Sequence, residues 1–128
     1  MRQTYLFIVT AILEVGTGLA LLGVPSVPVA LLLGVDQTAP ELAICARIAG
    51  GALLALGVAC WLGRSDRRGP AQLGLLTGVL IYDAAAAMIL AYAGCFLSPV
   101  GVALWPAVVL HGVLALWSVV AVWNAVNS

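Results

Sequence analysis

The sequence contains very little charge. Of its 128 residues, 8% are Asp, Glu, Lys or Arg, 64% are hydrophobic, and the formal net charge is zero. A soluble domain typically carries about a quarter charged residues, so a chain this apolar could not cover its own surface in water. Zero net charge also provides no broad positive field to attract nucleic acid. These absences predict a membrane protein with no nucleic-acid partner.

The motifs of soluble catalytic sites are also missing. The three cysteines form no CxxC pair, the only histidine is His111, and there is neither an HExxH motif nor a metal-spaced Cys/His cluster. The pair Gly50-Gly51 lies inside an apolar run rather than after a strand, so it is not a phosphate-binding loop. Nothing resembles a nucleophile elbow. The sequence therefore predicts no metal site and favours a function other than catalysis.

Long apolar runs dominate what is present. Crossing a bilayer takes about 20 apolar residues, and four segments meet that length: 4–23, 41–62, 73–94 and 103–123. Pro25 and Pro28 end the first segment. The apolar run 27–34 is too short to span, so we expect an interfacial or re-entrant helix there. We predict an all-α membrane protein, a bundle of four transmembrane helices that forms a single domain over 1–128.

Basic residues gather in one connection. Arg64, Arg67 and Arg68 lie between the second and third predicted spans, and Arg2 lies at the N-terminus. The positive-inside rule then places both termini and this loop in the cytoplasm, and we expect a bacterial inner membrane. The same three loop arginines could also bind anionic lipid head groups.

Four ionisable residues interrupt the spans, one in each: Glu14, Arg47, Asp83 and His111. At a rise of about 1.5 Å per residue from the cytoplasmic ends, they lie at roughly 15, 22, 16 and 18 Å respectively. All four therefore fall within one slab of a hydrocarbon core about 30 Å thick. An unpaired charge at such depth costs at least about 2.5 kcal/mol, so we predict a buried polar network.

Within this network we expect Arg47 to pair with Glu14, because a guanidinium can donate two parallel hydrogen bonds to one carboxylate. Thr10 and Thr17 share the helix face of Glu14. Asp83 then pairs with His111 or stays protonated. On this hypothesis Arg47→Ala strongly destabilises the fold, because it leaves a buried carboxylate unpaired.

Small residues predict close helix packing. Gly50 and Gly51 share a face of the second span, and Gly74 and Gly78 form a GxxxG pair in the third. Such positions let a neighbouring backbone approach closely, either within the chain or between chains. We expect the lipid bilayer as one partner, and a homo-oligomer or a larger membrane complex as the assembly.

The polar network has three interpretations. The favoured one is that it fixes helix register in a structural or accessory subunit of a membrane complex, without a cofactor. The second is a proton-coupled or ion-coupled transport site, since intramembrane carboxylates and histidines form proton relays. The third is a pigment, haem or lipid site. His111 could ligate a haem or chlorin, and Ala107-x3-His111 has the small-residue spacing of light-harvesting helices, although a six-coordinate haem would need a second histidine.

Two family resemblances follow from these segments. A Gly-rich first span, an apolar Pro-containing loop and then ARIAGGALLALG resemble the small four-helix bacterial membrane proteins grouped as DoxX-like. This resemblance covers about the first half of the chain and implies a fold rather than a function. Glu14 in AILEVGTG is similar to the membrane-embedded glutamate of small multidrug resistance transporters, which binds drug and protons. Asp83, His111 and the expected Arg47 pair depart from that pattern.

Overall fold

The computed structural model describes residues 2–35, 38–66 and 69–127. These residues form five helices and contain no β-strand. The helices in chain order are α1 (Arg2–Gly23), α2 (Ser26–Leu33), α3 (Pro40–Gly63), α4 (Pro70–Phe96) and α5 (Leu104–Val126). All except α2 are long and apolar enough to cross a membrane. The predicted four long helices and the short helix after the first are therefore confirmed.

Proline and glycine account for several helix boundaries. Pro40 and Pro70 stand at the first positions of α3 and α4, where the missing N–H costs no helical hydrogen bond. Gly34 ends α2 in the left-handed conformation with φ 67°, and its N–H donates to the carbonyl of Ala30 at 2.9 Å. That geometry is the common glycine cap of a helix C-terminus.

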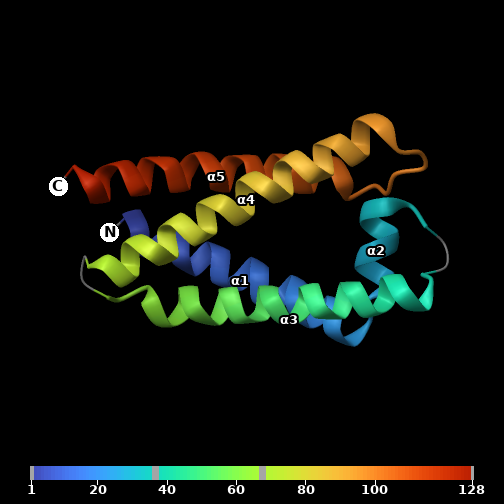
Figure 1. Ribbon diagram of the computed structural model, residues 1–128, viewed down its shortest axis with the longest axis horizontal. Helices are drawn as coiled ribbons and strands as arrows, with labels where there is room; N and C mark the ends of the chain where they lie inside the picture. The colour runs from blue at the N-terminus through green and yellow to red at the C-terminus, as the bar shows by residue number, and fades with distance from the viewer. Residues whose placement is uncertain (1, 36–37, 67–68, 128) are drawn as a thin grey trace.

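The long helices form two antiparallel pairs. We call α1 and α3, joined by α2, the first hairpin, and α4 and α5 the second hairpin (Figure 1). Within each hairpin the helices pack along their lengths, whereas the two hairpins touch each other only locally. The start of α1, the end of α5 and the α3–α4 connection all lie at one end of the bundle (Figure 1). We call this the terminal end. The opposite end, which α2 crosses, is the α2 end.

Glycines set the register of the first hairpin. A Cβ added to Gly18 would lie 2.7 Å from the carbonyl oxygen of Gly50, and one added to Gly57 would lie 2.8 Å from Cγ2 of Val15. Only glycine allows the two backbones to approach this closely. The predicted packing role therefore holds for Gly50.

The other predicted packing glycines face open space. A Cβ on Gly51, Gly74 or Gly78 would meet nothing within 4 Å. These three residues make no close helix contact within the described chain. A role for them in contacts between chains remains a prediction. Within the chain, the close approach of helix backbones occurs instead at Gly18, Gly50 and Gly57.

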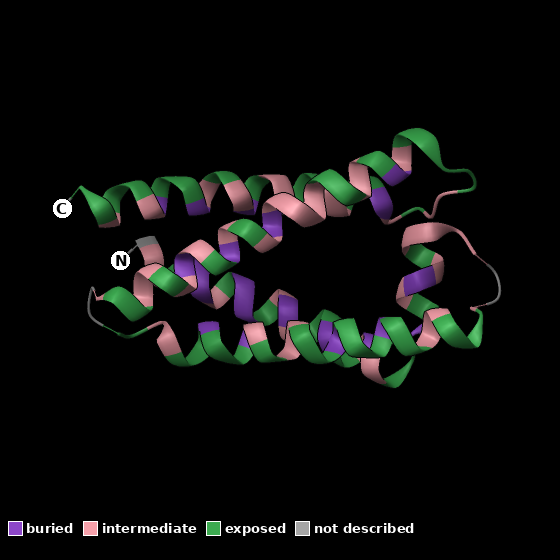
Figure 2. Ribbon diagram, viewed as in Figure 1, coloured by how far each residue is buried: buried purple, intermediate pink, exposed green. Residues whose placement is uncertain are grey.

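The main core lies toward the terminal end, where all four long helices contribute buried residues (Figure 2). Its members are Leu6, Phe7, Ala11, Cys60, Leu76, Val79, Leu114 and Ala121. A second, smaller cluster at the α2 end joins Leu21, Val29 and Ala46 of the first hairpin. Among the described residues, dense apolar packing therefore joins the hairpins at the terminal end.

Candidate functional site

Three polar side chains from three helices meet partway along the bundle. Glu14 of α1, Asp83 of α4 and His111 of α5 each offer a donor atom, and these atoms lie within 4.8 Å of one another. Nδ1 of His111 lies 2.8 Å from Oδ1 of Asp83, so the predicted contact of these two residues is present. Glu14 is 2% exposed and Asp83 0% exposed. We call these three residues the polar cluster, and it bridges the two hairpins.

The cluster residues of α4 and α5 lie on the same helix faces as buried residues of the main core. Val79 lies one turn before Asp83 on α4, and Leu114 lies about one turn after His111 on α5. Both apolar residues are buried in the main core. Because residues three or four apart share a helix face, Asp83 and His111 continue these core faces. The cluster therefore lies directly beyond the packed core.

Tyr82 belongs beside the cluster, and sequence reasoning missed it. Its ring meets the His111 imidazole edge-on, with centroids 5.5 Å apart and planes at 86°. Its phenol also lies near the Glu14 carboxylate. The available signal was its place next to Asp83 within an apolar span. A hydroxyl there needs a polar partner, as buried tyrosines usually do.

Several buried polar atoms lack a hydrogen-bond partner among the described residues. They include Oδ2 of Asp83, Oγ1 of Thr10 and Oγ of Ser118. Thr10 is 0% exposed and lies one turn before Glu14 on α1. The large majority of buried side-chain polar atoms in proteins have a hydrogen-bond partner. The unpartnered atoms therefore mark this region as unusual.

Arg47 does not belong to the cluster, which corrects the predicted pair with Glu14. Its side chain is exposed, and its Nε donates to the carbonyl of Leu22 at 3.1 Å. The contact of Gly18 with Gly50 places Arg47 level with the last turn of α1, well beyond Glu14. Carbonyls in a last turn lack helical partners, and a basic side chain there also complements the helix dipole. Arg47 therefore caps α1.

A cavity of about 410 Å³ lies between the hairpins at the α2 end. His111, Tyr82 and Thr17 are the polar residues on its wall. The remaining wall is apolar and comes from Leu21, Pro28, Leu31, Leu32, Leu53, Ala86, Ile89, Leu90, Ala103, Ala107 and Leu110. Thr17 is exposed on this wall rather than buried in the network, which corrects its predicted place.

Backbone hydrogen bonds tie the far side of this cavity together. The N–H of Gly101 donates to the carbonyl of Leu32 at 3.0 Å, and that of Ala103 donates to Leu31 at 2.9 Å. The α4–α5 connection thereby satisfies carbonyls at the end of α2, which a short helix leaves unpaired. The cavity thus lies between two polar junctions of the hairpins: the polar cluster and this connection.

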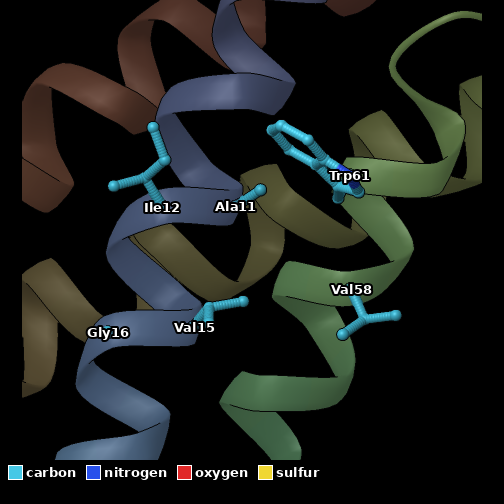
Figure 3. Close-up of a pocket in the computed structure, with 6 residues that line it drawn as sticks. All are labelled: Ala11, Ile12, Val15, Gly16, Val58 and Trp61. Carbon is cyan, nitrogen blue, oxygen red and sulfur yellow. The ribbon is translucent and has the colours of Figure 1, made fainter.

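A second groove is almost entirely apolar, and the indole N–H of Trp61 is the one polar side-chain group among its lining residues. It lies between α1 and α3, has a volume of about 430 Å³, and is lined by Ala11, Ile12, Val15, Gly16, Val58 and Trp61 (Figure 3). Val15 points toward α3, whereas Ile12 points away from it (Figure 3). This groove therefore has fewer polar groups to orient a ligand than the cavity at the α2 end, which has three polar side chains on its wall.

Arg64, one of the arginines expected to set topology, lies near the terminal end. The guanidinium of Arg64 stacks 3.9 Å above the Trp61 ring centroid and donates to the Trp61 carbonyl. Arg67 and Arg68 lie outside the described residues.

Comparison with family models, with curated proteins and with solved structures finds no match to this chain. The resemblances to DoxX-like proteins and to small multidrug resistance transporters therefore stay predictions.

Proposed function

We propose that this chain is an integral membrane protein that binds a small, mostly apolar molecule with one polar end in the cavity between its hairpins. The observation that carries the proposal is the cavity of about 410 Å³, whose apolar wall is interrupted by His111, Tyr82 and Thr17. Small-molecule sites are typically apolar clefts of about 300–1,000 Å³ with a few polar groups that fix orientation. Both features are present.

The chemistry of the wall determines how such a molecule would lie. Nδ1 of His111 is engaged by Asp83, which leaves Nε2 for a ligand. The His111 side chain is 15% exposed. A hydroxyl or carbonyl at the polar end of the ligand would contact His111 and Tyr82. The apolar body would extend along α2 and the alanines of α4 and α5.

The mouth of the cavity favours entry from lipid. Ile89, Leu31 and Leu110 line the cavity and are 67%, 45% and 39% exposed. Apolar side chains at an opening fit a hydrocarbon surrounding better than water. The ligand class that follows is a lipophilic alcohol, phenol or ketone that partitions into the bilayer.

The membrane placement that fits the fold is a bacterial inner membrane with both termini in the cytoplasm. Four helices are long and apolar enough to span. Arg64 lies in the α3–α4 connection at the terminal end, and the positive-inside rule favours the cytoplasmic side for that end.

The test is binding of 4-octylphenol to the purified full-length protein in detergent, by isothermal titration. Ala107→Phe should lower the affinity at least tenfold, because Ala107 lines the cavity and a benzyl group would fill it. The matched control is Val109→Phe, two residues along α5, because Val109 is 64% exposed. Octylbenzene, which lacks the hydroxyl, should bind more weakly than octylphenol.

Equal affinity of the Ala107→Phe variant and the wild type would contradict binding in this cavity. Equal affinity for octylbenzene and octylphenol would contradict recognition of a polar end. Circular dichroism and size-exclusion profiles of both variants verify that each remains folded.

A structural role in a membrane complex is the second candidate, because the polar cluster connects the two hairpins beside the main core and buried polar networks can specify one arrangement. Native mass spectrometry after gentle extraction from the source membrane separates the candidates. A bound small molecule on a monomer or homo-oligomer supports the binding function. A stoichiometric complex with other polypeptides supports an accessory subunit.

A further inference from the structure

The polar cluster has the geometry of a metal site. Its three donors come from three helices and lie within 4.8 Å of one another. Carboxylate and imidazole ligands bind Zn²⁺ at about 2.0–2.2 Å, so two ligands of one ion lie about 3 Å apart. The 2.8 Å between Nδ1 of His111 and Oδ1 of Asp83 is close to that spacing. The Glu14 carboxylate lies within 4.8 Å of the other two donors and would have to move closer to enter the same shell.

Two unpartnered atoms point independently to a missing ligand. Oδ2 of Asp83 has no hydrogen-bond partner among the described residues, and Asp83 is 0% exposed. The Thr10 hydroxyl, one turn from Glu14, is likewise buried and unpartnered. A buried polar atom without a partner destabilises the fold. An ion bound by Asp83 would give Oδ2 a partner, and a water bound to that ion would be the donor available to Thr10.

Charge balance leads to the same class of ligand. Metal ligation requires ionised carboxylates and a neutral imidazole, so a cluster that binds an ion would carry two negative charges, which are costly in an apolar interior unless they are balanced. Arg47 does not supply the balancing charge, because it lies well beyond Glu14, is exposed and donates to the Leu22 carbonyl. A divalent cation would make the cluster neutral.

We propose that Glu14, Asp83 and His111 bind a divalent transition-metal cation, with Zn²⁺ as the reference ion. One imidazole and two carboxylates suit Zn²⁺, Mn²⁺ or Fe²⁺ better than Mg²⁺ or Ca²⁺, which take oxygen ligands. His111 binds through Nδ1 with its hydrogen on Nε2, the nitrogen left for the cavity. Three protein ligands leave at least one position for water. This site goes beyond the proposed binding of an apolar molecule.

The experiment uses purified full-length protein that is first treated with a chelator and then titrated with Zn²⁺ or Co²⁺. We expect one bound ion per chain, a Co²⁺ absorption spectrum in the visible range, and a rise in melting temperature with Zn²⁺. X-ray absorption at the zinc edge should show nitrogen and oxygen neighbours and no sulfur. A second titration in a Cys45→Ser/Cys95→Ser background excludes the two exposed cysteines as ligands.

Three variants assign the ligands: Glu14→Gln, Asp83→Asn and His111→Gln. Changes in outer-shell partners of a metal typically weaken affinity about 10–100-fold, and loss of a direct ligand should exceed that range. The matched control is Glu41→Gln at the start of α3, since Glu41 is an exposed carboxylate far along the chain from the cluster. Its affinity for Zn²⁺ should equal that of the wild type.

Two results would overturn the proposal. One is the absence of saturable Zn²⁺ and Co²⁺ binding by folded wild-type protein, a measurement that does not depend on any variant folding. The other is unchanged binding in all three ligand variants. Octylphenol binding by the metal-free protein is measured in parallel. If the protein binds octylphenol but neither Zn²⁺ nor Co²⁺, the metal site is refuted and the proposed function stands.

Discussion

The two ends of the bundle differ in how the hairpins meet. At the terminal end, fully buried side chains such as Leu6, Phe7 and Leu76 fill the space between α1, α3, α4 and α5. At the α2 end the corresponding space is a cavity, and the hairpins meet through backbone hydrogen bonds from Gly101 and Ala103. The polar cluster lies at the boundary between these regions. Dense packing therefore supplies stability on one side, while the other side is left open for binding.

The largest expected effect is a loss of folding stability when a buried side chain of the main core is truncated. Leu76→Ala should destabilise the protein by about 2–5 kcal/mol, because Leu76 is 0% exposed and its removal leaves a void. Leu90→Ala should cost less than half as much, because Leu90 already borders the cavity. Unfolding by SDS titration in mixed micelles, followed by circular dichroism, measures both. Equal costs would contradict the comparison between the two ends.

A smaller effect is expected from disturbing the α2 end. Gly101→Ala would place a Cβ against the carbonyl of Leu31, and overpacking of this kind typically costs about 1–3 kcal/mol. It should also weaken octylphenol binding, because the hydrogen bonds that hold α2 to the α4–α5 connection are lost. Gly78→Ala is the control, since a Cβ there meets nothing within 4 Å. Unfolding and binding are both measured, and full retention of binding by Gly101→Ala would show that this junction does not shape the cavity.

The smallest effect is expected at Arg47. Because Arg47 is exposed and makes one hydrogen bond to a carbonyl, Arg47→Gln should cost about 1 kcal/mol or less. Thermal unfolding should therefore resemble that of the wild type. A cost above about 3 kcal/mol would instead match the loss of a buried ion pair and restore the pairing with Glu14.

Much of the fold was predictable from local signals. Apolar runs, with prolines such as Pro25 and Pro40 at their borders, indicate where each long helix begins and ends. The depth count also brought Glu14, Asp83 and His111 to similar levels, and the structure places them together. These inferences depend on spacing along one helix or on the common thickness of a membrane.

Which residues of different helices contact one another was harder to predict from the sequence. The error at Arg47 arose because depth alone does not give the register of two helices, which Gly18 and Gly50 determine through backbone contact. Gly50 and Gly51 are adjacent in sequence, yet only one faces a neighbour. The cavity was missed for a related reason: its wall combines α2 with Ala86 and Ala107 of the second hairpin. Such combinations depend on the tertiary arrangement rather than on any local pattern.

The division into hairpins has a consequence for biosynthesis. All of α1, α2 and α3 lies within residues 2–63, so the first hairpin can assemble while the rest of the chain is still on the ribosome. Glu14 is then synthesised before Asp83 and His111 have been translated. The polar cluster, which draws on α1, α4 and α5, can therefore form only after both hairpins have been made.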